Sequence, residues 1–194
     1  ADAARTCGYS VQLPGDVLTN QLHSVVMQYA DQLLTRDATS QLLDELRKSS
    51  PKLVDDVVPA MVSLGELQSM LRDLAAAGVS IRPLPLILET LASIAAGTPN
   101  RFERIEKIRV RLGRHITAGL AGDANLPIAA FTVADELQNR IACAWDRDEE
   151  EIRLDMPPSV IEKLALAIEE ASLRMSAGGL RPIALVPQSI RPVI

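Results

Sequence analysis

Apolar and polar residues follow a helical spacing along much of the first half of the chain. From Asp16, a predicted N-cap, to residue 34, apolar side chains recur three or four positions apart, which predicts an amphipathic helix. Thr35 and Pro51 then mark the predicted starts of two further short helices. The apolar positions of the first helix are Leu18, Leu22, Val25, Val26, Tyr29 and Leu33.

Two prolines interrupt the helical pattern in the middle of the chain. Pro83 and Pro85 have fixed φ angles and push the residues before them towards extended geometry, so the sequence predicts a strap, not a continuous helix. The helix before the strap opens with Ser63 and Glu66, a capping box, and is expected to end at Gly78. The helix after the strap is expected to bury Leu84, Ile87, Leu88 and Leu91.

A long amphipathic helix is predicted after residue 100. Its apolar face comprises Phe102, Ile105, Ile108, Leu112 and Ile116. Six basic residues between 101 and 114 outnumber Glu103 and Glu106, which gives this helix a net charge of +4. Such a face fits an anion-binding surface, a subunit contact or plain solvation, and the absence of an aromatic platform favours the last two.

The pattern changes after residue 118, where short apolar runs alternate with helical segments. The sequence predicts strands at 127–133, 151–154 and 182–186 and helices at 134–145 and 157–175. A further strand is predicted at 9–13, with Pro14-Gly15 as its turn. The acidic run 146–151 reads as a solvated loop, since it lacks the spacing of a calcium loop.

These elements define an α+β fold that is predominantly helical. A compact multi-helix subdomain, 16–118, is followed by a small α/β subdomain, 119–194, with about three strands, and residues 1–15 precede them with one strand and a turn. The exact boundary lies between Gly97 and Gly122.

Composition narrows the functional classes. Of the 194 residues 47% are hydrophobic and 3% aromatic, which indicates a core of Leu, Ile, Val and Ala. A net charge of −5 argues against nucleic-acid binding by the whole molecule. Cys7 and Cys143 lack disulfide or metal spacing, and no apolar run is long enough to cross a membrane.

The sequence contains none of the common catalytic motifs. Walker A, dinucleotide-binding, zinc-protease and serine-nucleophile motifs are all absent, and His23 and His115 provide little material for acid–base catalysis. We therefore expect no enzymatic activity, cofactor or metal. Arg82 and Glu89 are candidate structural residues of the strap, and Arg104 and Arg111 of the basic helix are candidate contacts between subunits.

Several motifs, in order, resemble the cytoplasmic C-terminal domain of the large export-gate membrane protein of bacterial type III secretion systems, flagellar and injectisome alike. The resemblance is strong between residues 29 and 92 and weaker over nearly all the rest. The matching runs are 29–36, 41–44, 51–54, 58–59, 64–68 and 79–91, with weaker matches at 8–11, 111–114 and 190–192.

The resemblance implies a soluble piece of an inner-membrane protein whose cytoplasmic domains form a ring, commonly of nine subunits. Such a ring receives export substrates with their chaperones, the gatekeeper protein and other export components, and the helical subdomain makes most of its contacts. The resemblance also implies that residues 1–15 are the last strand and turn of a preceding subdomain that is mostly missing from this sequence. The family's chaperone pocket lies mostly upstream of residue 1, so no docking residue is assigned. The alternative is a free-standing regulatory or nucleic-acid-binding module that uses the basic face 101–114.

Overall fold

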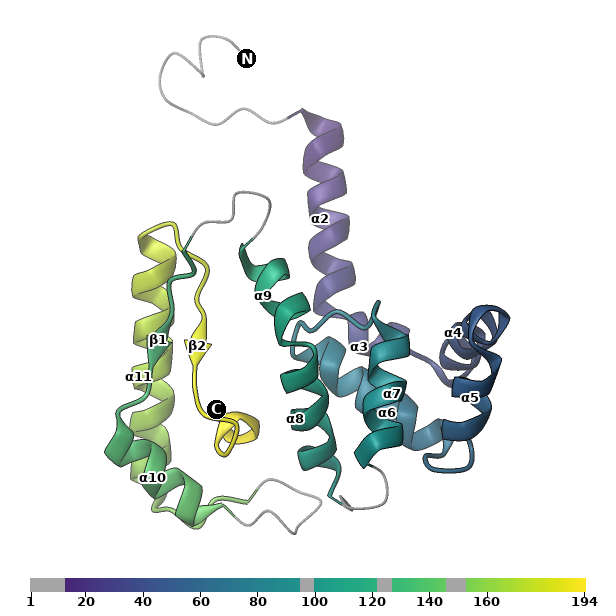
Figure 1. Ribbon diagram of the computed structural model, residues 1–194. Helices are drawn as coiled ribbons and strands as arrows, with labels where there is room; N and C mark the ends of the chain where they lie inside the picture. Colours follow the sequence, from purple (N-terminus) through teal and green to yellow (C-terminus); the bar gives the residue numbers. More distant parts are fainter. Residues whose placement is uncertain (1–12, 95–99, 122–126, 146–152) are drawn as a thin grey trace. The chain divides into compact units, whose positions relative to one another are not determined.

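The computed structural model describes residues 13–94, 100–121, 127–145 and 153–194. Internal contacts divide the chain into two compact units, residues 1–92 and 93–194. The described part of the first unit is helical and the second combines helices with a small sheet, which confirms the predicted α+β class (Figure 1). The helices of the first unit are α2 (Pro14–Gln28), α3 (Ala30–Leu33), α4 (Arg36–Ser49), α5 (Pro51–Val57), α6 (Leu64–Ala76) and α7 (Leu84–Ile94).

Local sequence signals explain where several helices of the first unit begin and end. The Thr35 side chain accepts a hydrogen bond from the Ala38 N–H and caps α4. Ser63 and Glu66 form the predicted capping box at the start of α6. Gly78 follows α6 with a φ of 68°, and its N–H and that of the next residue return to carbonyls of the last turn, as in a Schellman motif.

The core of the first unit is built by α4 to α7. The predicted stripe of α7 is buried, since Ile87, Leu88 and Leu91 have no exposed surface. It belongs to a core that also contains Val54 of α5 and Leu71 of α6, each completely buried. The strap connects α6 and α7, and the burial of the apolar faces of these two helices holds both of its ends in place.

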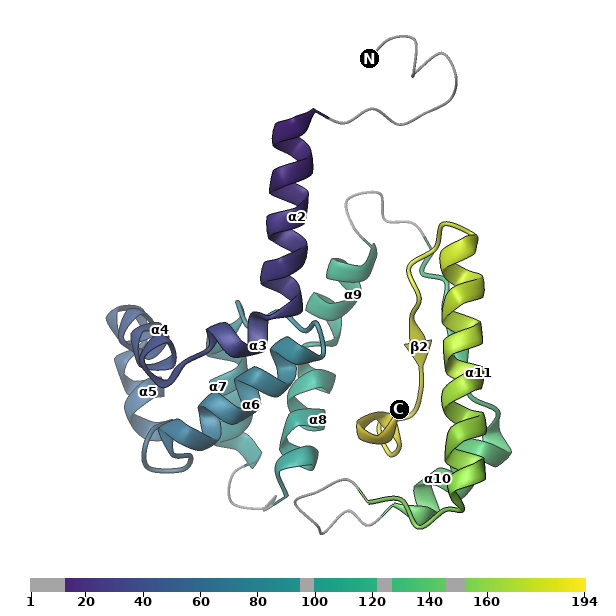
Figure 2. The same cartoon turned by 180° about the vertical axis from the view of Figure 1, so that it is seen from behind.

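Helix α2 behaves differently from the other helices of this unit. It projects away from them in both views (Figures 1 and 2). Its predicted apolar stripe is exposed, with 71% of Leu18 and 65% of Leu22 accessible to solvent. The predicted cap was wrong: α2 begins at Pro14, with Leu13 as N-cap, so Asp16 lies in the first turn and Pro14-Gly15 is helical instead of a turn. Residues 9–12 of the predicted strand lie outside the described residues.

The second unit begins with α8 (Arg101–Arg111) and α9 (Gly113–Ala121). The sequence predicted one long helix here, but the chain leaves α-helical geometry at Leu112, with φ −78° and ψ 1°, and a second helix starts at Gly113. The predicted apolar face is otherwise found, because Ile105, Ile108 and Leu112 are buried. Asn100 caps α8, because its side-chain Oδ1 accepts hydrogen bonds from the N–H groups of Phe102 and Glu103.

The α/β elements complete the second unit. Strand β1 (Phe131–Thr132) pairs in parallel with β2 (Ala184–Leu185). Helices α10 (Asp135–Ala144) and α11 (Pro158–Ala177) connect the strands, and a 3-10 turn, η1 (Arg191–Val193), ends the chain. The apolar cluster of this part consists of Val133, Ile141, Val186 and Ile190, with partly buried neighbours from α10, α11 and η1.

The strand predictions fare unevenly. Both strands of the described sheet lie within predicted strands, 127–133 and 182–186. The predicted strand 151–154 is represented among the described residues by an isolated antiparallel bridge from Trp145 to Leu154. The acidic run 146–151 lies outside the described residues.

The contact-based division falls after Ala92, which places α8 and α9 with the α/β elements. The predicted subdomain limits at residues 15 and 118 stay predictions. No helix within the described ranges is both long enough and apolar enough to span a bilayer.

Candidate interaction surfaces

Arg82 and Glu89, the candidates in the first unit, are both exposed. Arg82 lies in the strap, where its N–H donates a hydrogen bond of 3.4 Å to the Ser80 Oγ. Glu89 lies on the solvent side of α7, opposite the buried stripe. The Arg82–Glu89 ion pair considered from the sequence is not formed among the described residues, so the strap is fixed by its prolines and by burial of Val79 and Leu84.

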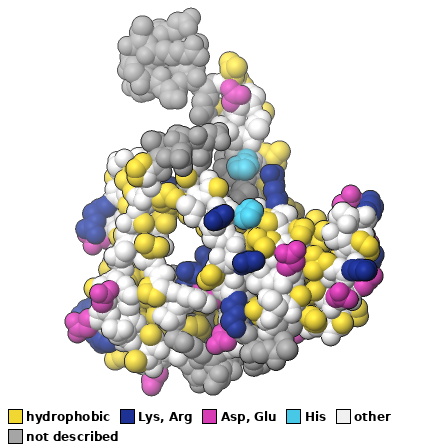
Figure 3. All heavy atoms as spheres, in the orientation of Figure 1, with side chains coloured by type: hydrophobic (Ala, Val, Ile, Leu, Met, Phe, Trp, Pro, Cys, Tyr) yellow, Lys and Arg dark blue, Asp and Glu magenta, His cyan; other side chains and the backbone are white. Residues whose placement is uncertain are grey.

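Arg104 and Arg111, the candidates in the second unit, both lie on α8. Arg111 is exposed and Arg104 is half-buried. With Lys107 they follow spacings of three and four residues, which places the three on one side of α8, and exposed Arg114 follows in the first turn of α9. Val110 lies between them with 62% of its surface exposed. Figure 3 shows basic side chains gathered over the region of α8 and α9.

The charge of this face differs in one respect from the expectation. Glu106 and Arg109 were counted on the basic face, but the Glu106 side chain is only 7% exposed and that of Arg109 is 19% exposed. Both therefore lie on the inner side of α8. The other five basic residues of 101–114, the last of them on α9, and Glu103 still give a net charge of +4.

Glu106 is held between two arginines. It accepts a short hydrogen bond from Nη1 of Arg191 in η1, and its Oε1 lies 3.7 Å from Nε of Arg109. Burial raises the pKa of the Glu106 carboxyl above its ordinary value, while the positive charges of Arg191 and Arg109 oppose that change. Burial likewise lowers the pKa of Arg109, against the attraction of Glu106. Burial therefore destabilises the Glu106 carboxylate more than its two ion pairs stabilise it.

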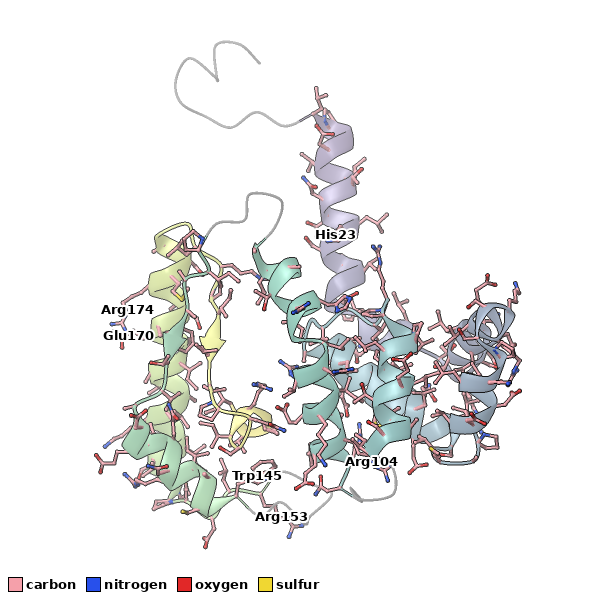
Figure 4. The ribbon with its side chains drawn as sticks, in the orientation of Figure 1. His23, Arg104, Trp145, Arg153, Glu170 and Arg174 are labelled. Atoms are coloured by element: carbon pink, nitrogen blue, oxygen red, sulfur yellow. The ribbon has the colours of Figure 1, made fainter. Side chains whose placement is uncertain are left out.

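An aromatic contact lies one turn earlier on the same helix. The rings of Phe102 and Trp145 pack edge to face, with centroids 6.3 Å apart and planes at 76°. Figure 4 labels Trp145, at the C-terminal end of α10. Together with Glu106–Arg191, this contact joins α8 to the α/β elements of the second unit.

A cavity of about 500 Å³ opens beside these contacts. Phe102, Glu103 and Glu106 line it from α8, and Trp145 and the segment 187–189 line it from the α/β elements. In the part of the chain that the structure describes, no cluster of three or more His, Cys, Asp or Glu side chains is placed to hold a metal ion.

Sequence reasoning missed Glu106, Arg191 and Trp145. Part of the signal was present, because Phe102, Glu106 and Arg109 are spaced i, i+4 and i+7 and must share one side of the helix. The partner Arg191 is 85 residues away from Glu106 in the sequence, and no local pattern indicates that the two side chains meet.

Comparison with known proteins gives relatives over the whole chain. Flagellar biosynthesis protein FlhA of Caulobacter vibrioides is 31% identical over 188 residues, which is 96% of this chain and 27% of that protein. FlhA of Bacillus subtilis is 33% identical over 177 residues, 89% of this chain and 26% of that protein. The chain thus spans about a quarter of the length of these relatives.

Solved structures share the fold at lower identity. The Chlamydia pneumoniae CdsV protein matches with a TM-score of 0.84 at 18% identity, over 99% of this chain and 55% of the other. Nonameric SctV-C of EPEC matches with a TM-score of 0.73 at 18% identity, over 90% of this chain and 59% of the other. The model of the FHIPEP family matches residues 1–194. The motif resemblance to the type III export-gate proteins is confirmed, and the chain belongs to the FHIPEP family.

Proposed function

We propose that this chain is a ring-forming and docking part of a type III export gate, located on the cytoplasmic side of a bacterial inner membrane. It acts as a scaffold and not as an enzyme. Export substrates with their chaperones, a gatekeeper protein and other export components are its proposed partners. The observation that carries the proposal is the family match over all 194 residues.

The comparisons support two finer points. SctV-C of EPEC, which shares the fold, is a nonamer, and we extend nine-fold ring formation to this chain. CdsV of Chlamydia pneumoniae has been solved in complex with CdsO, at a TM-score of 0.78 to this chain, and this supports docking of another protein. Neither likeness, at 18% identity, identifies contact residues.

The proposed subunit contacts are polar and exposed. Arg82 and Glu89 in the first unit and Arg111 in the second lie at the surface, and Arg104 is partly accessible. Charged residues at such positions set the register and rate of association more than its strength. We therefore expect their loss to slow or misdirect assembly without unfolding either unit.

Sedimentation velocity over a wide concentration range tests this assignment. The native chain is expected to form species approaching nine protomers, and the Arg104→Ala/Arg111→Ala and Arg82→Ala/Glu89→Ala variants are expected to form them more slowly or with a different number of protomers. Glu170→Ala/Arg174→Ala is the control, because it likewise removes two exposed charged side chains, which on α11 form an ion pair 3.2 Å apart (Figure 4). Assembly by all variants alike would show that the four residues are not contacts.

A secretion assay with the full-length protein separates assembly from docking. Variants that fail to form rings should also fail to export, whereas variants that lose a docking site should form rings and accumulate cargo in the cell. A chain that stays monomeric at every concentration would place the ring contacts elsewhere in the protein. Normal export by the full-length Arg104→Ala/Arg111→Ala protein would also contradict the assignment.

The exposed basic face of α8 supports one alternative, a nucleic-acid-binding module. That function predicts binding to DNA or RNA that weakens steeply with salt, because counterions are released on contact with phosphates. The net charge of −5 opposes it. Binding of a labelled oligonucleotide at low and at high salt distinguishes the two functions.

A further inference from the structure

Two side-chain contacts hold α8 against the α/β elements of the second unit, and the space beside them is not filled. Glu106 of α8 pairs with Arg191 of η1, and Phe102 of α8 packs on Trp145. The cavity of about 500 Å³ lies between the same elements and is lined from both sides. In the described part of the chain, no backbone hydrogen bond joins α8 or α9 to α10, α11, η1 or the strands. An interface with a void and no backbone pairing separates at lower cost than a closely packed one.

Arg191 is fixed to the α/β elements and not to α8. The residue before it, Ile190, is completely buried in the apolar cluster of this part, and Val193 packs against the same cluster. The Arg191 N–H also donates a hydrogen bond to the carbonyl oxygen of Pro187, 3.2 Å away. The guanidinium therefore moves with the α/β elements, and its contact with Glu106 depends on where α8 lies.

The ion pair can break without leaving a buried charge alone. Glu106 keeps a second partner on its own helix, because its Oε1 lies 3.7 Å from Nε of Arg109. The Arg191 side chain is 31% exposed, so water replaces its partner when the contact is lost. Burial raises the pKa of the Glu106 carboxyl, and water that enters between the elements therefore stabilises the carboxylate. The closed contact is thus held weakly enough to be reversible.

We propose that Glu106 and Arg191 form a releasable latch between α8 and the α/β elements. With the latch closed, η1 lies against α8 and the Trp145 ring stays covered. With the latch open, the α/β elements move away from α8 as a folded body, the cavity widens and the Trp145 ring becomes accessible. This conformational change takes place within one chain and does not depend on ring formation or on docking.

Trp145 provides the readout, because it is the only tryptophan in the sequence and is 8% exposed. Its accessibility is measured by fluorescence quenching with acrylamide, which is uncharged. We expect Arg191→Met to raise the open population, and with it the quenching constant, about threefold. Arg174→Met is the matched control, because Arg174 also pairs with a glutamate, but at the exposed surface of α11. A quenching constant for Arg191→Met equal to that of the control would overturn the proposal.

A double variant tests whether the charge of Glu106 drives release. In Arg191→Met the buried carboxylate has lost one of its two partners and gains hydration when the latch opens, and Glu106→Gln removes that charge. We therefore expect Arg191→Met/Glu106→Gln to return the quenching constant towards the native value. A double variant quenched as strongly as Arg191→Met would overturn the latch, because Arg191 would then act by packing alone. Helical circular dichroism should be the same in all variants, and its loss together with increased quenching would mean unfolding and would also overturn the proposal.

Discussion

Gln68, in α6, donates a hydrogen bond from its side-chain Nε2 to the backbone carbonyl oxygen of Leu34, 2.8 Å away. Leu34 is buried and lies between α3 and α4, where its carbonyl is outside any helix. One side chain thus connects α6 to a junction 34 residues earlier in the chain. A buried carbonyl that loses such a donor bears the full cost of its lost hydration.

Replacing Gln68 by methionine tests this connection. The side chain keeps its length but loses the donor, so we expect the free energy of unfolding to fall by about 1–2 kcal/mol. Urea unfolding followed by circular dichroism measures the change. Gln41→Met, at an exposed position of α4, is the control and should have almost no effect. Equal midpoints for the two variants would mean that the Gln68 hydrogen bond contributes nothing net.

Gly78 and Gly65 make a matched pair for backbone conformation. A Cβ atom at either position would meet no atom within 4 Å, but Gly78 has a φ of 68° and Gly65 is helical. Gly78→Ala is expected to lower the free energy of unfolding by about 1–2 kcal/mol, because a left-handed conformation strains an L-residue. Gly65→Ala is expected to raise it by roughly 0.5 kcal/mol. Thermal unfolding measures both, and equal shifts would contradict the conformational explanation.

Leu71 and Leu22 test how far α2 contributes to the first unit. Leu71 is completely buried, so Leu71→Ala is expected to lower the free energy of unfolding by about 2–5 kcal/mol. Leu22 is 65% exposed, so Leu22→Ala is expected to lower it by less than about 0.5 kcal/mol. Chemical denaturation of the two variants provides the comparison. A large loss for Leu22→Ala would show that the α2 stripe is covered in solution.

Local signals predicted much of the fold. Thr35, Ser63 with Glu66, and Gly78 act through neighbours three to five residues away, so their motifs contain the whole interaction. The α7 stripe was equally predictable, because a helix with apolar residues on one side must bury that side.

The remaining differences arise from interactions that the sequence does not encode locally. The α2 stripe has helical periodicity, but periodicity does not state what covers it, and in this structure it is exposed. The sequence pattern placed Glu106 on the exposed face of its helix, because no residue near it in the sequence indicates its partner, Arg191 in η1. The candidates Arg82, Glu89, Arg104 and Arg111 remain predictions, since their role concerns other subunits.

The raised pKa of Glu106 predicts a pH dependence with a definite sign. Burial raises the pKa of Glu106 in the folded protein above the ordinary value of 4.5. Between these two pKa values the folded protein keeps a proton that the unfolded chain has already released. The contribution of Glu106 to stability is therefore complete below pH 4.5 and is lost as the pH rises through the folded-state pKa. The loss amounts to about 1.4 kcal/mol for each pKa unit of the difference. We expect Glu106→Gln to remove this fall in stability with pH and the control Glu162→Gln, at an exposed position of α11, to keep it. Urea unfolding between pH 4 and 8 measures both variants. A wild-type stability that rises with pH relative to Glu106→Gln would mean that the attraction of the two arginines outweighs burial.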